Sequence, residues 1–431
     1  MYNVGGSGSW STLDALLSPI QPPRMVRVKQ RFPHPPAVDV AAEIKRQFEQ
    51  KNTLARVKPG ERVAITVGSR GIANQVTAVK TLVELLRGAG AEPFIVPAMG
   101  SHAGATAEGQ KAMLLGMGYT KEATGADIIS SMETVELDRT EDGMPVLCDK
   151  NAAQADWLIV MNRIKPHVCF RGPYESGLMK MITIGLGKQQ GADIAHNLGF
   201  EHMHKHVPQI AEKALEHLSV LCAVGLVENA FHETAICAVL EKEEMMERER
   251  ELLCQAKDWA AKLFFDKLDV LIIDEIGKNI SGAGFDTNVV GRYHSPIMSG
   301  GPKIKRLLIL DISEKSKGNG NGLGMADFTT RRAAEKFDFV QTYPNTLTAK
   351  LTGGVKIPMT LPNDLQGVQS CLKTSNLPDY RTATVVRIHN TLCLDEIEVS
   401  ETLLDQIRGD ERFEIVSEPY DMKFDENGNL F

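Results

Sequence analysis

The sequence predicts an α/β protein with two α/β domains. Short apolar runs of strand length, such as Arg62–Val67, alternate with segments of helical apolar spacing, such as Asn74–Arg87. The alternation starts again at Leu268–Asp274, after the charged segment Glu241–Phe265, which we interpret as a solvated helix between domains. The length of 431 residues allows two or three domains of roughly 100–200 residues each. The expected division is an N-terminal domain over 1–240, a helical connector over 241–266 and a C-terminal domain over 267–431, whose last residues can return to the first domain.

The individual elements are predicted from apolar spacing and from glycine and proline punctuation. Residues 1–30 are rich in Gly, Ser and Pro, which predicts a loosely held arm. In the first domain we expect helices at Val38–Gln50, Asn74–Arg87, from Ala107 and at Val207–Leu218, strands at Arg62–Val67, Pro93–Pro97 and Asp156–Met161, and a strand pair across Val220–Leu240. In the second we expect strands at Leu268–Asp274, Arg306–Asp311, Thr384–Ile388 and Phe413–Val416, and helices at Ala326–Phe337 and Asp364–Thr374.

Composition argues against several classes of partner. The net charge of −7 is unsuited to nucleic acid, which is bound by basic surfaces. The sequence contains no run of eighteen apolar residues, so no membrane span is predicted. The N-terminus lacks the features of a signal peptide. The seven cysteines are dispersed without a CxxC pair, which is typical of reduced thiols in the cytoplasm and argues against a cysteine-ligated metal.

Three basic side chains follow three strands of the predicted N-terminal sheet. Arg70 lies in the turn after Arg62–Val67, His102 in the loop after Pro93–Pro97, and His167 just after the third strand. Ligands of open α/β sheets bind outside the carboxyl ends of the strands, so these residues are candidates for one site. Each residue alone is also compatible with an ordinary surface loop.

The stretch from Pro166 to His196 carries further candidates. We expect a helix beyond Gly177 with Lys180 near its start, a break at Gly185 and Gly187, and a turn over Gly191–His196. No GxGxxG, phosphate-loop or GxSxG motif is present. The series His202-x-His204-x-His206 is predicted to lie on a helix, where residues two apart point to different sides, which argues against a metal site.

These residue types suit one kind of chemistry. Two histidines can move protons near neutral pH, and an arginine can bind a carboxylate in bidentate geometry. A lysine can attach a cofactor covalently, and a further imidazole can bind a borderline metal such as nickel.

The segments VGSRGIAN, PAMGSHAGATAEGQ and PHVCFRGPYESGLMK, followed by KQQGADIAH, resemble the nickel-dependent lactate racemase family. The resemblance implies racemisation or epimerisation of a small-molecule 2-hydroxy acid by hydride transfer, in a cleft between the two domains. It implies a nickel-pincer pyridinium mononucleotide as cofactor, with thioamide and thiocarboxylate groups, supplied by cofactor-biosynthesis enzymes. By this resemblance Lys180 attaches the cofactor, and His196, sixteen residues later, binds nickel. The other implied roles are acid/base catalysis by His102 and His167, substrate binding by Arg70, and cofactor binding by Ser69, Gly71 and Lys188.

The sequence departs from the family pattern in two places. His167 and Lys180 are thirteen residues apart, without paired glycines before the lysine. In the second domain, the loop 286–294 has Gly291 and His294 where the family has a glutamine and a lysine. These departures indicate a hydroxy acid different from or larger than lactate, with Asn288, Arg292 or His294 contacting it, although an ordinary loop would also explain these three. The alternatives are a related hydroxy-acid oxidoreductase or lyase, and a non-catalytic nickel- or cofactor-binding protein.

Overall fold

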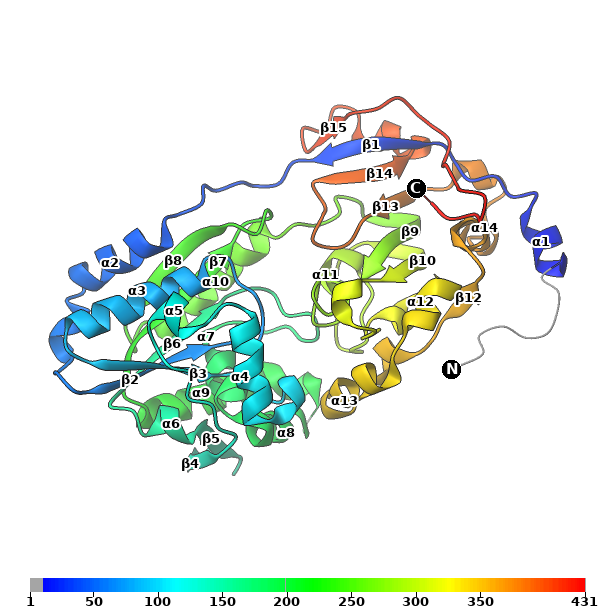
Figure 1. Cartoon of the computed structure of the whole chain (residues 1–431). Helices are drawn as coiled ribbons and strands as arrows, with labels where there is room; N and C mark the ends of the chain where they lie inside the picture. The colour runs from blue at the N-terminus through cyan, green and yellow to red at the C-terminus, as the bar shows by residue number, and fades with distance from the viewer. Residues whose placement is uncertain (1–10, 198, 431) are drawn as a thin grey trace. The chain divides into compact units, whose positions relative to one another are not determined.

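The computed structural model describes residues 11–197 and 199–430 (Figure 1). The chain forms two compact units, one of residues 33–260 and one that joins the segment up to Phe32 with residues from Ala261 onward. The first ten residues of the predicted arm lie outside the described residues. Both units combine helices with sheets, so the predicted α/β class is confirmed. The predicted location of the site between two domains stays a prediction.

The unit of residues 33–260 contains a sheet of five described strands. Their order is β3 (Glu92–Pro97), β2 (Arg62–Val67), β6 (Trp157–Arg163), β7 (Val220–Glu228) and β8 (Thr234–Leu240). The first four are parallel, and β8 is antiparallel to β7. The strands β2, β3 and β6 were predicted within two residues of these bounds. Because β2, β3 and β6 are parallel, their carboxyl ends lie at one edge of the sheet, as predicted.

Helices cover both faces of this sheet. Helices α2 (Val40–Gln50) and α3 (Gln75–Gly88) share a buried core with side chains of β2, β3, β6, β7 and β8, including Val224 and Leu226. Side chains alternate between the faces of a strand. Accordingly, a Cβ placed on Gly225 would point away from that core, toward Leu252 of α10 (Met245–Trp259). Other helices of this unit are α4 (Ala107–Gly116), α5 (Lys121–Thr124), α6 (Lys150–Ala153) and α9 (Met203–His217), and β4 (Thr134–Arg139) pairs with β5 (Pro145–Asp149).

The segment after Gly177 differs from the prediction. Helix α7 (Leu178–Lys180) continues into a π-helical turn, Met181–Gly185, and a second helix, α8, spans Lys188–Asn197. The predicted break occurs, because Lys188 has a left-handed backbone with φ of 55°. The predicted turn over Gly191–His196 is wrong, since these residues are helical. Gly191 instead permits close packing, because its Cα lies 3.1 Å from the position of a Cβ on Gly187.

The other unit contains a mixed sheet, in which eight strands are described. In order they are β12 (Met359–Leu361), β11 (Phe328–Thr330), β10 (Lys303–Ile312), β9 (Lys267–Ile276), β13 (Val385–Ile388), β14 (Glu396–Ser400), β1 (Met25–Gln30) and β15 (Phe413–Ile415). The first five are parallel and the last three antiparallel. Helices α1 (Ser11–Leu17), α11 (Thr287–Val290), α12 (Arg331–Lys336), α13 (Phe339–Ala349), α14 (Asp364–Thr374) and α15 (Leu404–Ile407) complete it.

Two predicted elements are corrected in this unit. The predicted helix Ala326–Phe337 begins with a strand, because the hydroxyls of Thr329 and Thr330 donate to the carbonyls of Ile309 and Leu310 on β10. The N-terminal segment, predicted as a loosely held arm, contains β1, which pairs with β14 and β15, shown beside it in Figure 1.

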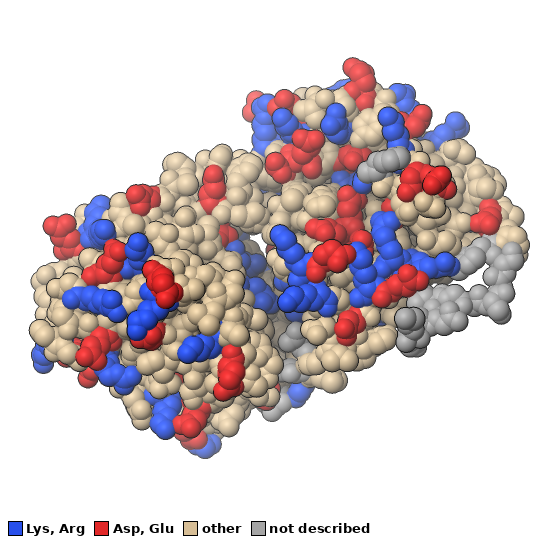
Figure 2. All heavy atoms as spheres, in the orientation of Figure 1, with Lys and Arg blue, Asp and Glu red and all other residues tan. Residues whose placement is uncertain are grey.

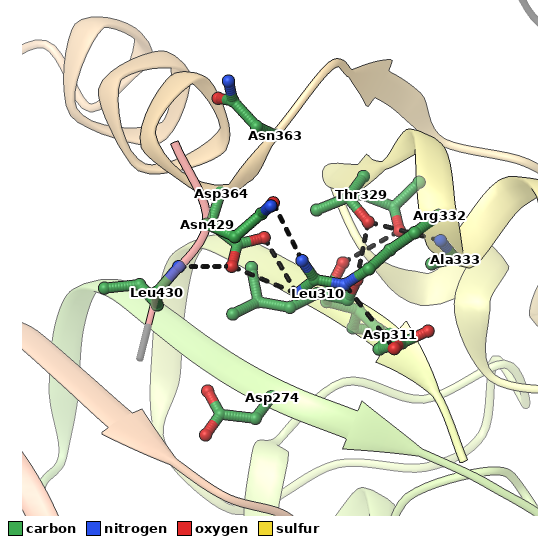
Figure 3. A network of polar contacts seen from close by, with 12 residues as sticks. Asp274, Leu310, Asp311, Thr329, Arg332, Ala333, Asn363, Asp364, Asn429 and Leu430 are labelled. Atoms are coloured by element: carbon green, nitrogen blue, oxygen red, sulfur yellow. Dashed lines mark hydrogen bonds and ion pairs between the residues drawn. The ribbon is translucent and has the colours of Figure 1, made fainter. Parts of the chain in front are cut away.

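The C-terminal residues also stay within this unit (Figure 3). The N–H of Leu430 donates to Asp364 over 2.9 Å, and Arg332 bonds both Asp364 and Asn429. These bonds tie the end of the chain to α12 and α14. The described C-terminal residues are therefore part of this unit.

On the face in Figure 2, Lys and Arg are interspersed with Asp and Glu. Among the described helices, none combines the length and apolar character needed to cross a membrane.

Candidate functional site

The predicted site residues fall into two groups. Ser69, Arg70 and Gly71 follow β2, His102 follows β3, His167 follows β6, Lys180 lies in α7, and Lys188 and His196 lie in α8, all within residues 33–260. Asn288, Arg292 and His294 lie in the other unit. The order of strands places β2 between β3 and β6, so the loop with Arg70 follows the strand between those that lead to the two histidines.

The loop after β3 holds His102 against the loop after β2. Nδ1 of His102 lies 2.5 Å from the hydroxyl of Ser69. Ala103, Gly104 and Ala105 follow with positive φ values of 55°, 71° and 54°. Left-handed backbone is costly for alanine and concentrates at functional sites, where the surrounding structure holds it in place.

Arg70 offers its guanidinium for an anion. This half-buried side chain donates to the carbonyl of Ser69 over 3.3 Å. In the described part of the chain no carboxylate is bonded to it, whereas the neighbouring Arg163 forms an ion pair with Glu228. Burial lowers the pKa of Arg70, and the charge of Arg163 lowers it further. Arginine remains protonated at any physiological pH, so this side chain is suited to bind a carboxylate.

His167 and Lys180 are in direct contact, with Nε2 of the imidazole 2.5 Å from Nζ of the lysine. The backbone N–H of Cys169 donates to Nδ1 of His167 over 3.0 Å. Nε2 and Nζ share one hydrogen bond, whose donor depends on the tautomer of His167. Burial disfavours the charged form of the lysine, and an amine with a lowered pKa is suited to be a nucleophile.

Electrostatics lower the pKa values of both groups. Burial lowers the pKa of Lys180 to about 8. Cys169 opposes this shift, while Arg70 and Lys165 add to it. Burial also lowers the pKa of His167 well below its usual value, and the lysine contributes to that shift.

We expect acetic anhydride to acylate Lys180 with a midpoint near pH 8. A lowered pKa means that the reactive amine is present at lower pH than in an ordinary lysine, whose pKa is ~10.4. Peptide mass spectrometry after brief labelling at a series of pH values measures the midpoint, with the denatured protein as the reference. If the midpoint is the same in the folded and the denatured protein, the fold does not lower the pKa of Lys180.

His196 lies in the same cluster. Its ring stacks on Phe200, with centroids 5.2 Å apart, and its charge acts on His167. The imidazole of His196 can bind nickel when a bound group supplies the further metal ligands.

Lys188 has a different environment from the one predicted. Its fully buried Nζ lies 3.0 Å from Asp149 and bonds the carbonyl of Pro97 and the side chain of Gln110. Gln110 in turn donates to the carbonyl of Gly100, in the loop that carries His102. The ammonium of Lys188 is thus surrounded by protein groups. These contacts favour a role in holding the loop after β3 over direct binding of a cofactor.

The predicted residues of the other unit also differ from one another. Arg292 forms an ion pair with Asp327 over 2.8 Å and donates to the carbonyl of Ile304, so its guanidinium holds the start of β10. Asn288 lies in α11. Burial lowers the pKa of His294 to about 4, so this imidazole is neutral at physiological pH.

Sequence patterns did not indicate two buried carboxylates beside the site. Glu175 accepts the backbone N–H of His167 over 2.7 Å, and Glu249 accepts that of Met179 over 2.8 Å. Glu175 lies within the segment PHVCFRGPYESGLMK, but no role was predicted for it. Glu249 is seventy residues away from Met179 in sequence, on a helix whose charge pattern suggested exposure to solvent. Only the folded chain brings them to the site.

Other metal-binding possibilities were compared with this site. In the described residues, one group of three acidic or imidazole ligands can be assembled, namely Asp138, Glu216 and His217, and it lies at the surface. The prediction of a helix at His202–His206 is confirmed for α9, which begins at Met203, and His202 ends the short 3₁₀ turn before it. The ring centroids of His202 and His206 are 5.7 Å apart.

The fold and the site define an α/β protein whose histidines, lysine and arginine gather at the carboxyl edge of a parallel sheet. Residues 14–207 match the model of the family described as the lactate racemase N-terminal domain. The predicted resemblance to that family is confirmed over these residues. The chain shares its fold with the lactate racemase apoprotein from Thermoanaerobacterium thermosaccharolyticum, with a TM-score of 0.51 and 15% identity over 85% of this chain and 95% of that one. Comparison with curated proteins found no match.

Proposed function

We propose that this protein is a racemase or epimerase of a 2-hydroxy acid that uses a nickel-pincer pyridinium mononucleotide attached to Lys180. The observation that carries the proposal is the strand order β3-β2-β6, in which the loop with Arg70 lies between those with His102 and His167. The match to the lactate racemase N-terminal domain supports it, because residues 14–207 include all of these loops.

The side chains present fit such a cofactor. Burial lowers the pKa of Lys180 to about 8, so the uncharged amine, which is the form that bonds an acyl or thioacyl carbon, is more available than in an ordinary lysine. His196 would supply an imidazole for nickel. The bound group would supply the acceptor for the hydride of Cα, a step that protein side chains do not perform alone.

The residues of this chain would bind, orient and deprotonate the substrate. Arg70 would hold the carboxylate, which fixes the position of Cα. The hydroxyls of two enantiomers point in different directions when their Cα–H bonds face one acceptor. His102 and His167, on either side of Arg70, would therefore each serve one enantiomer as proton acceptor and return the proton for the other.

The proposal is tested by intact mass and metal analysis of protein made together with cofactor-biosynthesis enzymes. We expect an adduct that maps to Lys180 and approximately one nickel per chain. Lys180→Ala should lose the adduct, and His196→Ala should keep the adduct but lose nickel, since it removes one metal ligand and not the attachment point. An adduct on another residue, or unchanged nickel in His196→Ala, would contradict these roles. Turnover of a 2-hydroxy acid distinguishes the enzyme from a cofactor-binding protein.

A further inference from the structure

Helix α10 is bonded to both segments that carry His167 and Lys180. The sequence predicted this helix as part of a connector between domains. In the structure it belongs to the unit of residues 33–260 and packs on α7 and β7. The following contacts make it part of the candidate site.

Glu249 of α10 binds the start of the helix that carries Lys180. Its fully buried carboxylate accepts the N–H of Met179 over 2.8 Å and also that of Leu178. The first N–H groups of a helix lack acceptors within the helix, and a carboxylate satisfies them. Burial raises the pKa of Glu249 to about 8, and the two N–H donors oppose the shift. A Cβ on Gly177 would overlap this carboxylate, so glycine is needed for the close approach.

Lys257 of α10 binds the segment that carries His167. Its Nζ lies 2.7 Å from Oε1 of Glu175, which is fully buried. The other oxygen of Glu175 accepts the N–H of His167 over 2.7 Å. Arg171 completes the arrangement by donating to the carbonyl of His167 over 2.7 Å.

We propose that Glu249 and Lys257 are positioning residues, which through the single helix α10 set the contact between Nζ of Lys180 and Nε2 of His167. The two side chains are eight residues apart, or about 12 Å along the helix axis. Neither contacts the reacting groups itself. The inference rests on the proposed function only in taking Lys180 and His167 as the working pair.

The test uses the full-length protein without cofactor and reads the pH dependence of acylation of Lys180 by acetic anhydride. In Glu249→Leu the start of α7 loses its acceptor, so Lys180 should leave its buried position beside His167. With less burial, its midpoint should rise from about 8 toward 10.5. Labelling at pH 7 should fall by up to ~300-fold, the ratio of uncharged fractions at those two pKa values. Glu249→Gln keeps an acceptor oxygen and should restore the midpoint. Glu251→Leu, an exposed position on the same helix, is the matched control and should leave it unchanged.

A lower melting temperature without a change in the midpoint would overturn the inference, as would equal shifts in the Leu and Gln variants at position 249. If Glu249→Leu does not fold, Lys257→Met and Gly177→Ala decide the question, because each disturbs one of the two anchors. A rise of the midpoint in these variants supports the inference, and an unchanged midpoint refutes it. The measurement needs no cofactor. A protein that shows these shifts but never carries nickel would refute the proposed function and leave this inference standing.

Discussion

Replacing His102 or His167 by alanine should slow racemisation by ~10²–10⁴-fold, the usual contribution of one general acid or base. The reason is geometric, because the loops with these histidines follow the two strands that flank β2, and the loop after β2 carries the arginine proposed to hold the carboxylate. Both directions of net turnover should suffer, since each full cycle uses one histidine as base and the other as acid.

The two variants should differ in the first half of the cycle. When loaded protein is mixed with a single pure enantiomer, each variant should lose the rapid spectral change of the cofactor mainly with one of the two. Loading must first be verified by intact mass, because His167 also contacts Lys180. His217→Ala, an exposed histidine on α9, is the matched control and should keep full turnover. If both variants respond equally well to both enantiomers, the two-base mechanism is wrong.

Asp149→Ala should destabilise the protein by about 3–5 kcal/mol, the usual cost of leaving one member of a buried ion pair alone. Asp149 and Lys188 are both fully buried and lie 3.0 Å apart. Asp149 also accepts the N–H groups of Asn151 and Ala152 at the start of α6, so its loss leaves further donors unsatisfied. Denaturant unfolding measures the change. Asp142→Ala removes an exposed pair with Lys205 and should cost only ~0–1 kcal/mol.

The pH dependence gives an independent check on Lys188. Burial lowers its pKa in the folded protein, and loss of Asp149 removes the main opposing charge, so the shift should grow in Asp149→Ala. The unfolded state then binds a proton that the folded state does not, between the lowered pKa and the ordinary pKa of 10.5. Stability of the variant should therefore rise with pH across this window, more steeply than that of the unchanged protein. Equal slopes would show that Lys188 is not desolvated.

Local pattern was sufficient for the strands that form the site. The apolar run Arg62–Val67 and the run that begins at Trp157 are buried parallel strands because only such strands are apolar on both faces. The residues that follow them in sequence must then lie at one edge of the sheet. For that reason Arg70, His102 and His167 could be grouped before the structure was known, and the spacing of Lys180 and His196 added the candidate for cofactor attachment.

Other features depended on contacts between residues distant in sequence. Gly191 lies within a helix and packs closely on Gly187, although the glycine pattern alone suggested a turn. Lys188 was expected at the cofactor, but Asp149, about forty residues earlier, neutralises it in the interior. A sequence shows that a lysine carries charge, and it does not show which partner will be buried with it.

The role of α10 shows the same limit most clearly. Its alternating charges are typical of a solvated helix, and most of them are exposed. Glu249, however, lies on the side of the helix that faces β7 and α7, and it is fully buried there. Apolar periodicity predicts which segments become helices and strands, because the spacing of apolar residues within a segment decides which of its faces can be buried. Which carboxylate meets the N–H groups of Leu178 and Met179 is decided only when the chain packs, because that bond joins residues about seventy positions apart.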